Sequence, residues 1–161
     1  MLDQLQFRVE GQWTAARRGR VETEGVKLPI HFSAPPEFQG EAGQWTPEHF
    51  FMAAVASCFI TTFRAIAENS RFEPVSLGVS AEGVVEKREG GYEFTRVVLR
   101  PLLTIREETD RQRAARLLKK TERACLVSRS LKSEVTMEPR IELAGMQDAP
   151  PGLQLAGAEK R

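Results

Sequence analysis

Apolar and polar residues alternate along the first third of the chain, a pattern typical of half-buried β-strands. Residues 4–10 show the alternation most clearly, and further strands are expected at residues 21–25 and 27–33. A basic segment, residues 15–20, lies between the first two of these strands. Residues 34–44 are rich in proline and glycine, which predicts a loop.

The longest apolar stretch, residues 50–63, predicts a helix that begins before it and continues beyond it. Thr46 can cap the N-terminus of this helix, Pro47 suits its first turn, and Glu48 suits the positive end of the helix dipole. We expect the helix to end near Asn69. Apolar residues lie on nearly all of its sides, so it should occupy the centre of a core or be shared between subunits.

Alternation returns in the second half of the chain, where residues 75–81 and 95–105 predict two strands. Residues 89–92 contain two glycines and should form the hairpin turn between these strands. Pro101 lacks a backbone N–H, which favours a sheet edge or a bulge for the second strand.

A second helix and a last strand complete the expected order. Residues 109–112 resemble a capping box that opens the helix, whose apolar face ends at Cys125 and whose opposite face is basic. The last strand is expected at residues 135–143. The order β-β-β-α-β-β-α-β predicts an α+β fold with an antiparallel sheet and two helices. Residues 1–144 should form a single domain and residues 145–161 a disordered tail.

Composition narrows the class of protein. The 161 residues are 41% hydrophobic, which is enough for a core, and the formal net charge of +1 does not by itself imply a nucleic-acid or membrane partner, so we expect neither. Two cysteines are too few for a secreted disulfide framework, and the first residues lack the pattern of a signal peptide, so we expect a cytoplasmic protein. Residues 50–67 have the length of a membrane span, but Arg64 inside this run favours a buried core helix.

Metal and nucleotide sites are not expected. The candidate metal ligands are His31, His49, Cys58 and Cys125, and no pair has the close spacing of a zinc motif. No glycine-rich loop leads from a strand into a helix in a nucleotide-binding pattern. We therefore expect neither a metal nor an organic cofactor.

The two thiols, Cys58 in the apolar helix and Cys125 at the end of the second helix, remain as candidates for chemistry. A buried cysteine is most often a small packing residue. A partner thiol and nearby charges would instead allow it to ionise and react. The arginines of the basic segment could supply such charge, although a solvated turn is the simpler interpretation of a charge run. These arginines are Arg17, Arg18 and Arg20.

Two segments resemble the OsmC/Ohr family of thiol-dependent peroxide reductases. Residues 46–63 (TPEHFFMAAVASCFITTF) are similar to the family's central helix, in which a Pro-Glu start and an apolar run precede the reactive cysteine. Residues 122–130 (ERACLVSRS) are similar to the segment around the family's second cysteine, with Leu126 where the family often has proline. The resemblance covers about residues 5–144 and agrees with the order of elements expected above.

This resemblance implies a peroxidase that reduces organic hydroperoxides, with hydrogen peroxide left open as a second substrate. Cys58 would be the peroxidatic thiolate, and Cys125 would be the resolving thiol that forms a disulfide with it. Glu48 would orient an arginine of the early turn, for which Arg17 is the first choice and Arg20 the second. An external thiol or dithiol would reopen the disulfide without a metal or an organic cofactor. The resemblance also implies an intertwined homodimer with its sites at the subunit interface.

Peroxide reduction needs a thiolate, whereas burial in an apolar helix raises the pKa of a thiol. We therefore expect an arginine to lower the pKa of Cys58 and to stabilise the departing oxygen. Ten residues of straight helix separate Glu48 from Cys58 by about 15 Å, too far for one arginine to contact both easily within one chain. A second copy of the helix in a homodimer would remove this difficulty.

Two other functions fit the same residues. A non-catalytic homodimer could bind an apolar ligand beside an inert Cys58, and a hydrolase or acyl-transfer enzyme could use Cys58 as its nucleophile. The apolar residues near Cys58 would suit an organic hydroperoxide, but each of them is also an ordinary core residue. A count of free thiols after addition of a hydroperoxide would separate these functions.

Overall fold

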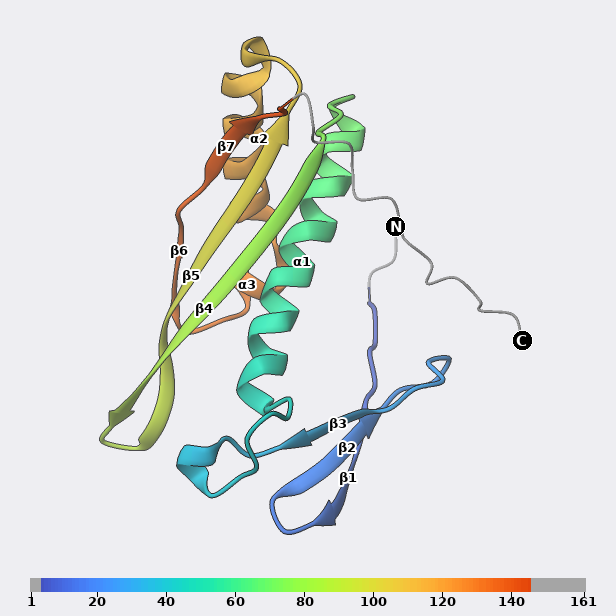
Figure 1. Ribbon diagram of the computed structural model, residues 1–161, viewed down its shortest axis with the longest axis vertical. Helices are drawn as coiled ribbons and strands as arrows, with labels where there is room; N and C mark the ends of the chain where they lie inside the picture. Colours follow the sequence, from blue (N-terminus) through green and yellow to red (C-terminus); the bar gives the residue numbers. More distant parts are fainter. Residues whose placement is uncertain (1–3, 146–161) are drawn as a thin grey trace, which may run out of the picture. The chain divides into compact units, whose positions relative to one another are not determined.

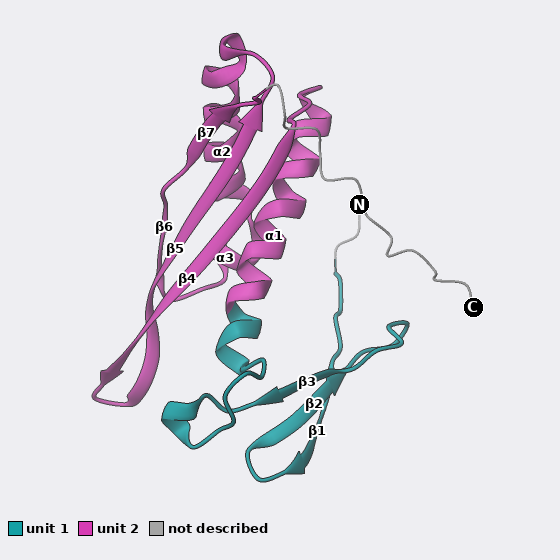
Figure 2. Cartoon of the chain, in the orientation of Figure 1, with its two compact units in different colours: residues 1–51 teal, residues 52–161 magenta. Residues whose placement is uncertain are grey.

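The computed structural model describes residues 4–145 (Figure 1), so the predicted tail lies outside the described residues except for residue 145. The chain divides into two compact units, Met1–Phe51 and Met52–Arg161 (Figure 2). The long helix α1 (Pro47–Asn69) begins in the first unit and continues through the second. Helices and strands occupy separate stretches of the chain, which confirms the predicted α+β class.

Unit 1 is built around an antiparallel sheet with the strand order β1-β2-β3. A 3-10 turn, η1, follows this sheet in the proline-rich loop. The bounds of these elements are β1 (Glu10–Ala15), β2 (Arg18–Glu22), β3 (Ile30–Ser33) and η1 (Pro36–Phe38). The strand predicted at residues 4–10 is misplaced, because β1 begins only at Glu10. Phe7 is 86% exposed, so the apolar residues that alternate with polar ones before β1 are not buried within this chain.

The basic segment forms the turn between β1 and β2 and the first residues of β2. Ala16 takes a positive φ of 46° in this turn, and Trp13 pairs with Gly19 across the hairpin. A side chain on Gly19 would come within 2.6 Å of the ring of Phe32, so glycine lets the ring lie against the strand. The turn therefore holds Arg17 and Arg18 in a defined backbone rather than in an open loop.

Helix α1 has the bounds that the sequence predicts. Thr46 Oγ1 accepts the backbone N–H of His49 at 3.3 Å, which confirms Thr46 as the cap. At the other end Arg71 takes a left-handed φ of 51°, and Phe72 N–H donates to the carbonyl of Ala67 at 2.9 Å, so the helix closes in a Schellman motif. By length and composition α1 could cross a membrane, as many core helices of soluble proteins could.

Unit 2 contains a four-stranded sheet whose central strand is β5. Its strands are β4 (Ser76–Arg88), β5 (Gly91–Ile105), β6 (Glu134–Met137) and β7 (Arg140–Leu143). The hairpin between β4 and β5 is confirmed, with the ladder closing at the pair Arg88 and Gly91. The expected all-antiparallel sheet with a single last strand is wrong: β6 and β7 are separate strands, and both run parallel to β5. The chain returns to β5 only after crossing over through a helix, and such a connection brings the next strand back in parallel.

Pro101 lies inside the sheet rather than at an edge, which corrects the prediction for this residue. It pairs with Val79 of β4 on one side of β5. On the other side β6 pairs as far as Leu99 and β7 begins at Leu102, so Pro101 faces the break between these two strands. A missing N–H at this position removes no bond from the sheet ladder.

The segment after β5 contains a 3-10 turn and two helices. Their bounds are η2 (Glu108–Asp110), α2 (Arg111–Ala124) and the one-turn helix α3 (Leu126–Arg129). The predicted capping box is wrong, because Asp110 is the N-cap and makes no capping bond with its side chain. Arg111 anchors the start of α2 instead, through an Nη1 bond to the carbonyl of Ile141 at 2.6 Å. Buried residues of α1, β5 and α2 meet in one core, which includes Phe59, Phe63, Leu99, Leu103, Leu118 and Cys125.

Candidate functional site

Cys58 lies on α1 and is half-buried, with its sulfur directed at the start of α3. The backbone N–H of Val127 donates to Cys58 Sγ at 3.5 Å. The hydroxyl of Thr62, one turn further along α1, lies 3.9 Å from the same sulfur. The sulfur thus has polar neighbours on an otherwise apolar helix.

Cys125 connects α2 to α3 and is fully buried. Its backbone N–H donates to the carbonyl of Thr121 at 2.9 Å, and its sulfur accepts a hydrogen bond from Ser128 Oγ at 3.2 Å. Both cysteines are free thiols, and their side chains lie near enough to influence each other's ionisation. The fold therefore brings together two sulfurs that are 67 residues apart in the sequence.

The two thiols differ in how readily they ionise. Burial raises the pKa of Cys58, but hydrogen bonds from the Val127 amide, the Cys125 thiol and the Thr62 hydroxyl outweigh it and hold the pKa below its ordinary value. Burial raises the pKa of Cys125, and the hydrogen bond from Ser128 offsets this only in part. In the reduced protein Cys58 is accordingly the sulfur that ionises more readily.

Within unit 2 the pKa of Cys58 is lowered by backbone amides and by the side chains of Cys125 and Thr62, and the arginine expected at this sulfur stays a prediction. The first N–H groups of a helix have no partner inside the helix, and those of α3 are available to the sulfur. The amide of Leu126 contributes together with that of Val127. Neither residue was expected at the site. The one indication in the sequence is Leu126 itself, because a proline at this position would have no N–H to donate.

Replacing Leu126 with proline is expected to raise the pKa of Cys58, because it deletes one donor to the thiolate. The backbone tolerates the change: Cys125 has φ −61° and ψ 111°, which suits a residue before proline, and Leu126 is the first residue of α3. Less of Cys58 is then ionised at neutral pH, so its alkylation should slow by about two- to threefold, while the rates of the variant and the wild type converge at high pH.

Leu126→Ala is the matched control, because it removes the same exposed side chain and keeps the N–H. The measurement is the ultraviolet absorbance of the thiolate as a function of pH, together with the alkylation rate. Equal titration curves for the proline and alanine variants would show that the Leu126 amide does not contribute.

Glu48 occupies the first turn of α1 and is half-buried. Its Oε2 atom is buried and has no hydrogen-bond partner among the described residues. A buried carboxylate oxygen without a donor is destabilising by about 1–3 kcal/mol or more. This oxygen is therefore a suitable acceptor for a further donor, of which a guanidinium is the strongest kind.

The three arginines of the basic segment, residues 15–20, have different partners. Arg18 pairs with the carboxylate of Glu41 at 3.2 Å, whereas Arg17 donates to the neutral amide of Gln39 at 3.1 Å. The third, Arg20, donates to the amide of Gln12 at 3.0 Å. None of the three forms an ion pair with Glu48 within residues 4–145, so the pairing of Glu48 with an arginine stays a prediction.

Arg17 and Arg18 line a polar cavity of about 440 Å³ in unit 1, together with Ser33, Gln39 and Glu41. Ser33 is fully buried and its Oγ accepts the backbone N–H of Glu41 at 2.8 Å, which fixes one wall of the cavity. Of the two arginines, Arg17 is the one that forms no ion pair with a carboxylate within residues 4–145. This supports Arg17 over Arg18 as the functional arginine.

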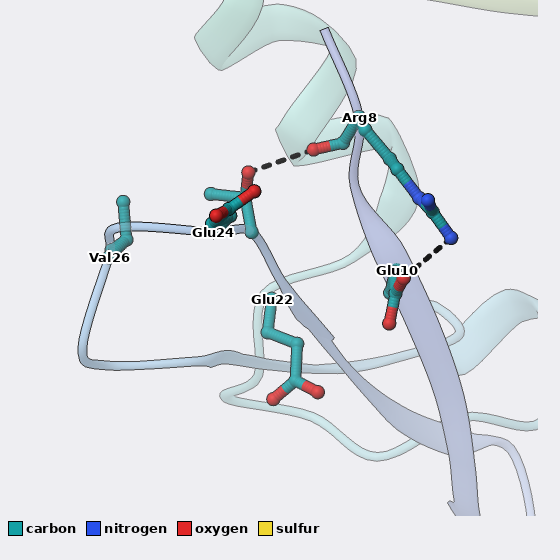
Figure 3. Close-up of a pocket in the computed structure, with 6 residues that line it drawn as sticks. Arg8, Glu10, Glu22, Glu24 and Val26 are labelled. Atoms are coloured by element: carbon teal, nitrogen blue, oxygen red, sulfur yellow. Dashed lines mark hydrogen bonds and ion pairs between the residues drawn. The ribbon is translucent and has the colours of Figure 1, made fainter.

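A second cavity in unit 1, of about 330 Å³, has an acidic lining (Figure 3). Arg8 pairs with Glu10 at 2.8 Å on one side of it, and Thr23 Oγ1 donates to the carbonyl of Arg8 at 2.8 Å. The remaining lining residues are Glu22, Glu24 and Val26, so the cavity contains no thiol. Within residues 4–145 no group of three or more His, Cys, Asp or Glu side chains is placed to hold a metal ion.

The arrangement of strands and helices is found in solved structures of OsmC and organic hydroperoxide resistance proteins. The chain belongs to the OsmC-like protein family, whose model matches residues 40–140. An OsmC-like protein of unknown function from Vibrio cholerae superposes with a TM-score of 0.74, at 23% identity over 84% of this chain and 99% of its own. An organic hydroperoxide resistance protein OsmC from Legionella pneumophila superposes with a TM-score of 0.69, at 23% identity over 86% of this chain and 99% of its own.

Relatives are also similar in sequence. YmaD of Bacillus subtilis is 26% identical over 86% of this chain and 96% of its own length. The peroxiredoxin OsmC of Escherichia coli is 27% identical over 78% of this chain and 87% of its own. An organic hydroperoxide resistance protein of Xanthomonas axonopodis is 30% identical over 49% of this chain and 57% of its own. The fold and the family predicted from the sequence are thereby confirmed.

Proposed function

We propose that this protein is a thiol peroxidase that reduces organic hydroperoxides through Cys58. The observation that carries the proposal is a pair of neighbouring free thiols with opposite tendencies to ionise. Cys58 is half-buried and its pKa is lowered, whereas Cys125 is buried and its pKa is raised. The names of two relatives, peroxiredoxin OsmC and organic hydroperoxide resistance protein, support hydroperoxides as the oxidant.

The proposed reaction has two chemical steps. The Cys58 thiolate attacks one peroxide oxygen, an S–O bond forms as the O–O bond breaks, and the alkoxide takes up a proton and leaves as an alcohol. The resulting sulfenic acid is then attacked by the sulfur of Cys125. The S–S bond forms, the S–O bond breaks, and the hydroxyl group leaves as water with the proton that Cys125 releases. An external thiol or dithiol supplies the two electrons that reopen the disulfide, a reaction suited to a reducing cytoplasm.

We assign Glu48 and Arg17 to the part of the site that binds the peroxide. Glu48 carries a buried oxygen without a donor, and Arg17 hydrogen-bonds only a neutral amide within residues 4–145. A two-pronged pair between them would satisfy both groups and fix the orientation of the guanidinium. Because amides of α3 already stabilise the thiolate, the main task of the arginine is to stabilise negative charge on the departing oxygen.

We further propose that the protein works as a homodimer. In the single chain only 28% of the most apolar stretch of α1 is buried. Small residues on its exposed face would let a second helix approach closely: Ala53, Ala54, Ser57 and Thr61. In unit 1 Trp13 is 74% exposed and Leu28 is 80% exposed, and burial of such large apolar side chains against a partner subunit would stabilise a dimer. Sedimentation should give a dimer, and a fully active monomer would contradict this part of the proposal.

Thiol counting tests the proposed function directly. Reduced protein mixed with one equivalent of an organic hydroperoxide should lose two thiols per chain and form an intramolecular disulfide. A protein that only binds an apolar ligand would keep both thiols on this time scale, and an acyl-transfer enzyme would instead give a burst with an activated ester. Retention of both thiols in the presence of the hydroperoxide would end the proposal.

A further inference from the structure

Ser128 hydrogen-bonds to the sulfur of Cys125, and neither step of the proposed reaction uses this contact. Its Oγ donates to Cys125 Sγ at 3.2 Å. Ser128 is only 9% exposed and Cys125 is fully buried, so water has little access to take the place of the hydroxyl. The neighbouring residue on α3, Val127, donates its backbone N–H to the other sulfur, that of Cys58.

We propose that Ser128 is a positioning residue for the second chemical step, in which its hydroxyl stabilises the negative charge that develops on the sulfur of Cys125 as the disulfide forms. This inference rests on the proposed peroxidase function and extends it to a residue that serves only the resolving thiol.

The physical reason is the environment of Cys125. To attack the sulfenic acid on Cys58, its sulfur must give up a proton while it lies within the apolar core formed by α1, β5 and α2. Charge in such a place is strongly disfavoured unless a hydrogen-bond donor accompanies it. Ser128 supplies that donor from the next turn of the chain, and its hydroxyl lowers the pKa of Cys125 against the dominant, opposite effect of burial.

The two chemical steps depend on different contacts made by α3. The first step uses the thiolate of Cys58, whose contact with Val127 comes from the backbone and does not depend on the side chain of Ser128. The second step uses Cys125, whose contact comes from the Ser128 hydroxyl. Loss of this hydroxyl should therefore slow disulfide formation and leave the attack on peroxide nearly unchanged.

The variant Ser128→Ala is expected to form the disulfide about tenfold more slowly, the effect of one hydrogen bond to a charged group. The pH at which disulfide formation reaches half of its maximal rate should also be higher than in the wild type, because the pKa of Cys125 rises when the donor is removed. The sulfenic acid then survives longer, so a second peroxide molecule converts more of it to the sulfinic acid.

Two further variants separate a specific role from a structural one. Ser128→Thr keeps the hydroxyl and should form the disulfide at about the wild-type rate. Ser130→Ala is the matched control, because Ser130 Oγ donates to the carbonyl of Leu126 at 2.9 Å at the end of the same short helix and contacts neither sulfur. It should form the disulfide at the wild-type rate.

The experiment has a peroxide arm and a disulfide arm. In the first, rapid quenching and mass spectrometry follow sulfenic acid formation, which depends on peroxide concentration, and disulfide formation, which does not. In the second, an aromatic disulfide reagent first forms a mixed disulfide on Cys58. Attack by Cys125 then forms the internal S–S bond, breaks the mixed one and releases the second aromatic thiolate, whose absorbance gives the rate.

A tenfold slower closure in Ser128→Ala in both arms, restored by threonine, is the expected result. Wild-type closure in Ser128→Ala, equal slowing of both steps, or failure of threonine to restore the rate would each overturn the role of Ser128. If the wild-type thiols do not react with peroxide, the proposed function fails, while the mixed-disulfide arm still decides whether Ser128 assists Cys125.

Discussion

Replacing Cys58 with serine is expected to reduce the rate of hydroperoxide reduction by roughly 10³-fold or more, because a hydroxyl cannot supply the nucleophile at neutral pH. The side chain is nearly the same size, so the fold should be retained. The measurement is hydroperoxide consumption in the presence of excess dithiol, with circular dichroism to check the fold. A Cys58→Ser variant that consumes peroxide at the normal rate would show that the reactive sulfur has been assigned wrongly.

The matching change at Cys125 is expected to give a different result. Cys125→Ser keeps Cys58, so one equivalent of peroxide should be consumed and Cys58 should stop at the sulfenic acid. Mass spectrometry of the intact chain would then show one added oxygen, which a sulfenic-acid reagent can trap. If Cys125→Ser is inert and Cys58→Ser reacts once, the roles of the two cysteines are reversed.

Replacing Arg17 with alanine is expected to lower kcat/KM for an organic hydroperoxide by about 10²–10³-fold, the usual effect of removing one donor to a developing oxyanion. Arg18→Ala is the matched control from the same turn, because Arg18 is already neutralised by Glu41 and should change the rate little. Arg20→Ala tests the second choice. A large loss in Arg18→Ala or Arg20→Ala with normal activity in Arg17→Ala would move the role to that arginine.

Mixed dimers test whether the site is shared between subunits. A dimer of one Cys58→Ser chain and one Arg17→Ala chain would retain one intact site if Arg17 acts on the cysteine of the partner subunit. Such a mixture should recover a substantial share of the activity that both parent dimers lack. If Arg17 acts within its own chain, no site is intact and no activity returns.

Elements with a strong local pattern could be predicted from the sequence. The apolar run and its cap determine α1 from Pro47 to Asn69, because periodicity and capping depend on neighbouring residues. The hairpin around Gly90 is local in the same way. The direction of β6 and β7 is not local: it depends on how the chain crosses back to β5, and no short segment records that path.

By itself the sequence determined the family, the central helix and the two sulfurs, since a cysteine and an apolar run can be recognised wherever they lie. Only the tertiary structure showed what surrounds these sulfurs. The backbone N–H of Val127 donates to Cys58, and every residue except proline has such an amide, so no residue type marks this role. The contact of Ser128 with Cys125 likewise depends on the turn that α3 takes, which positions the hydroxyl beside the sulfur.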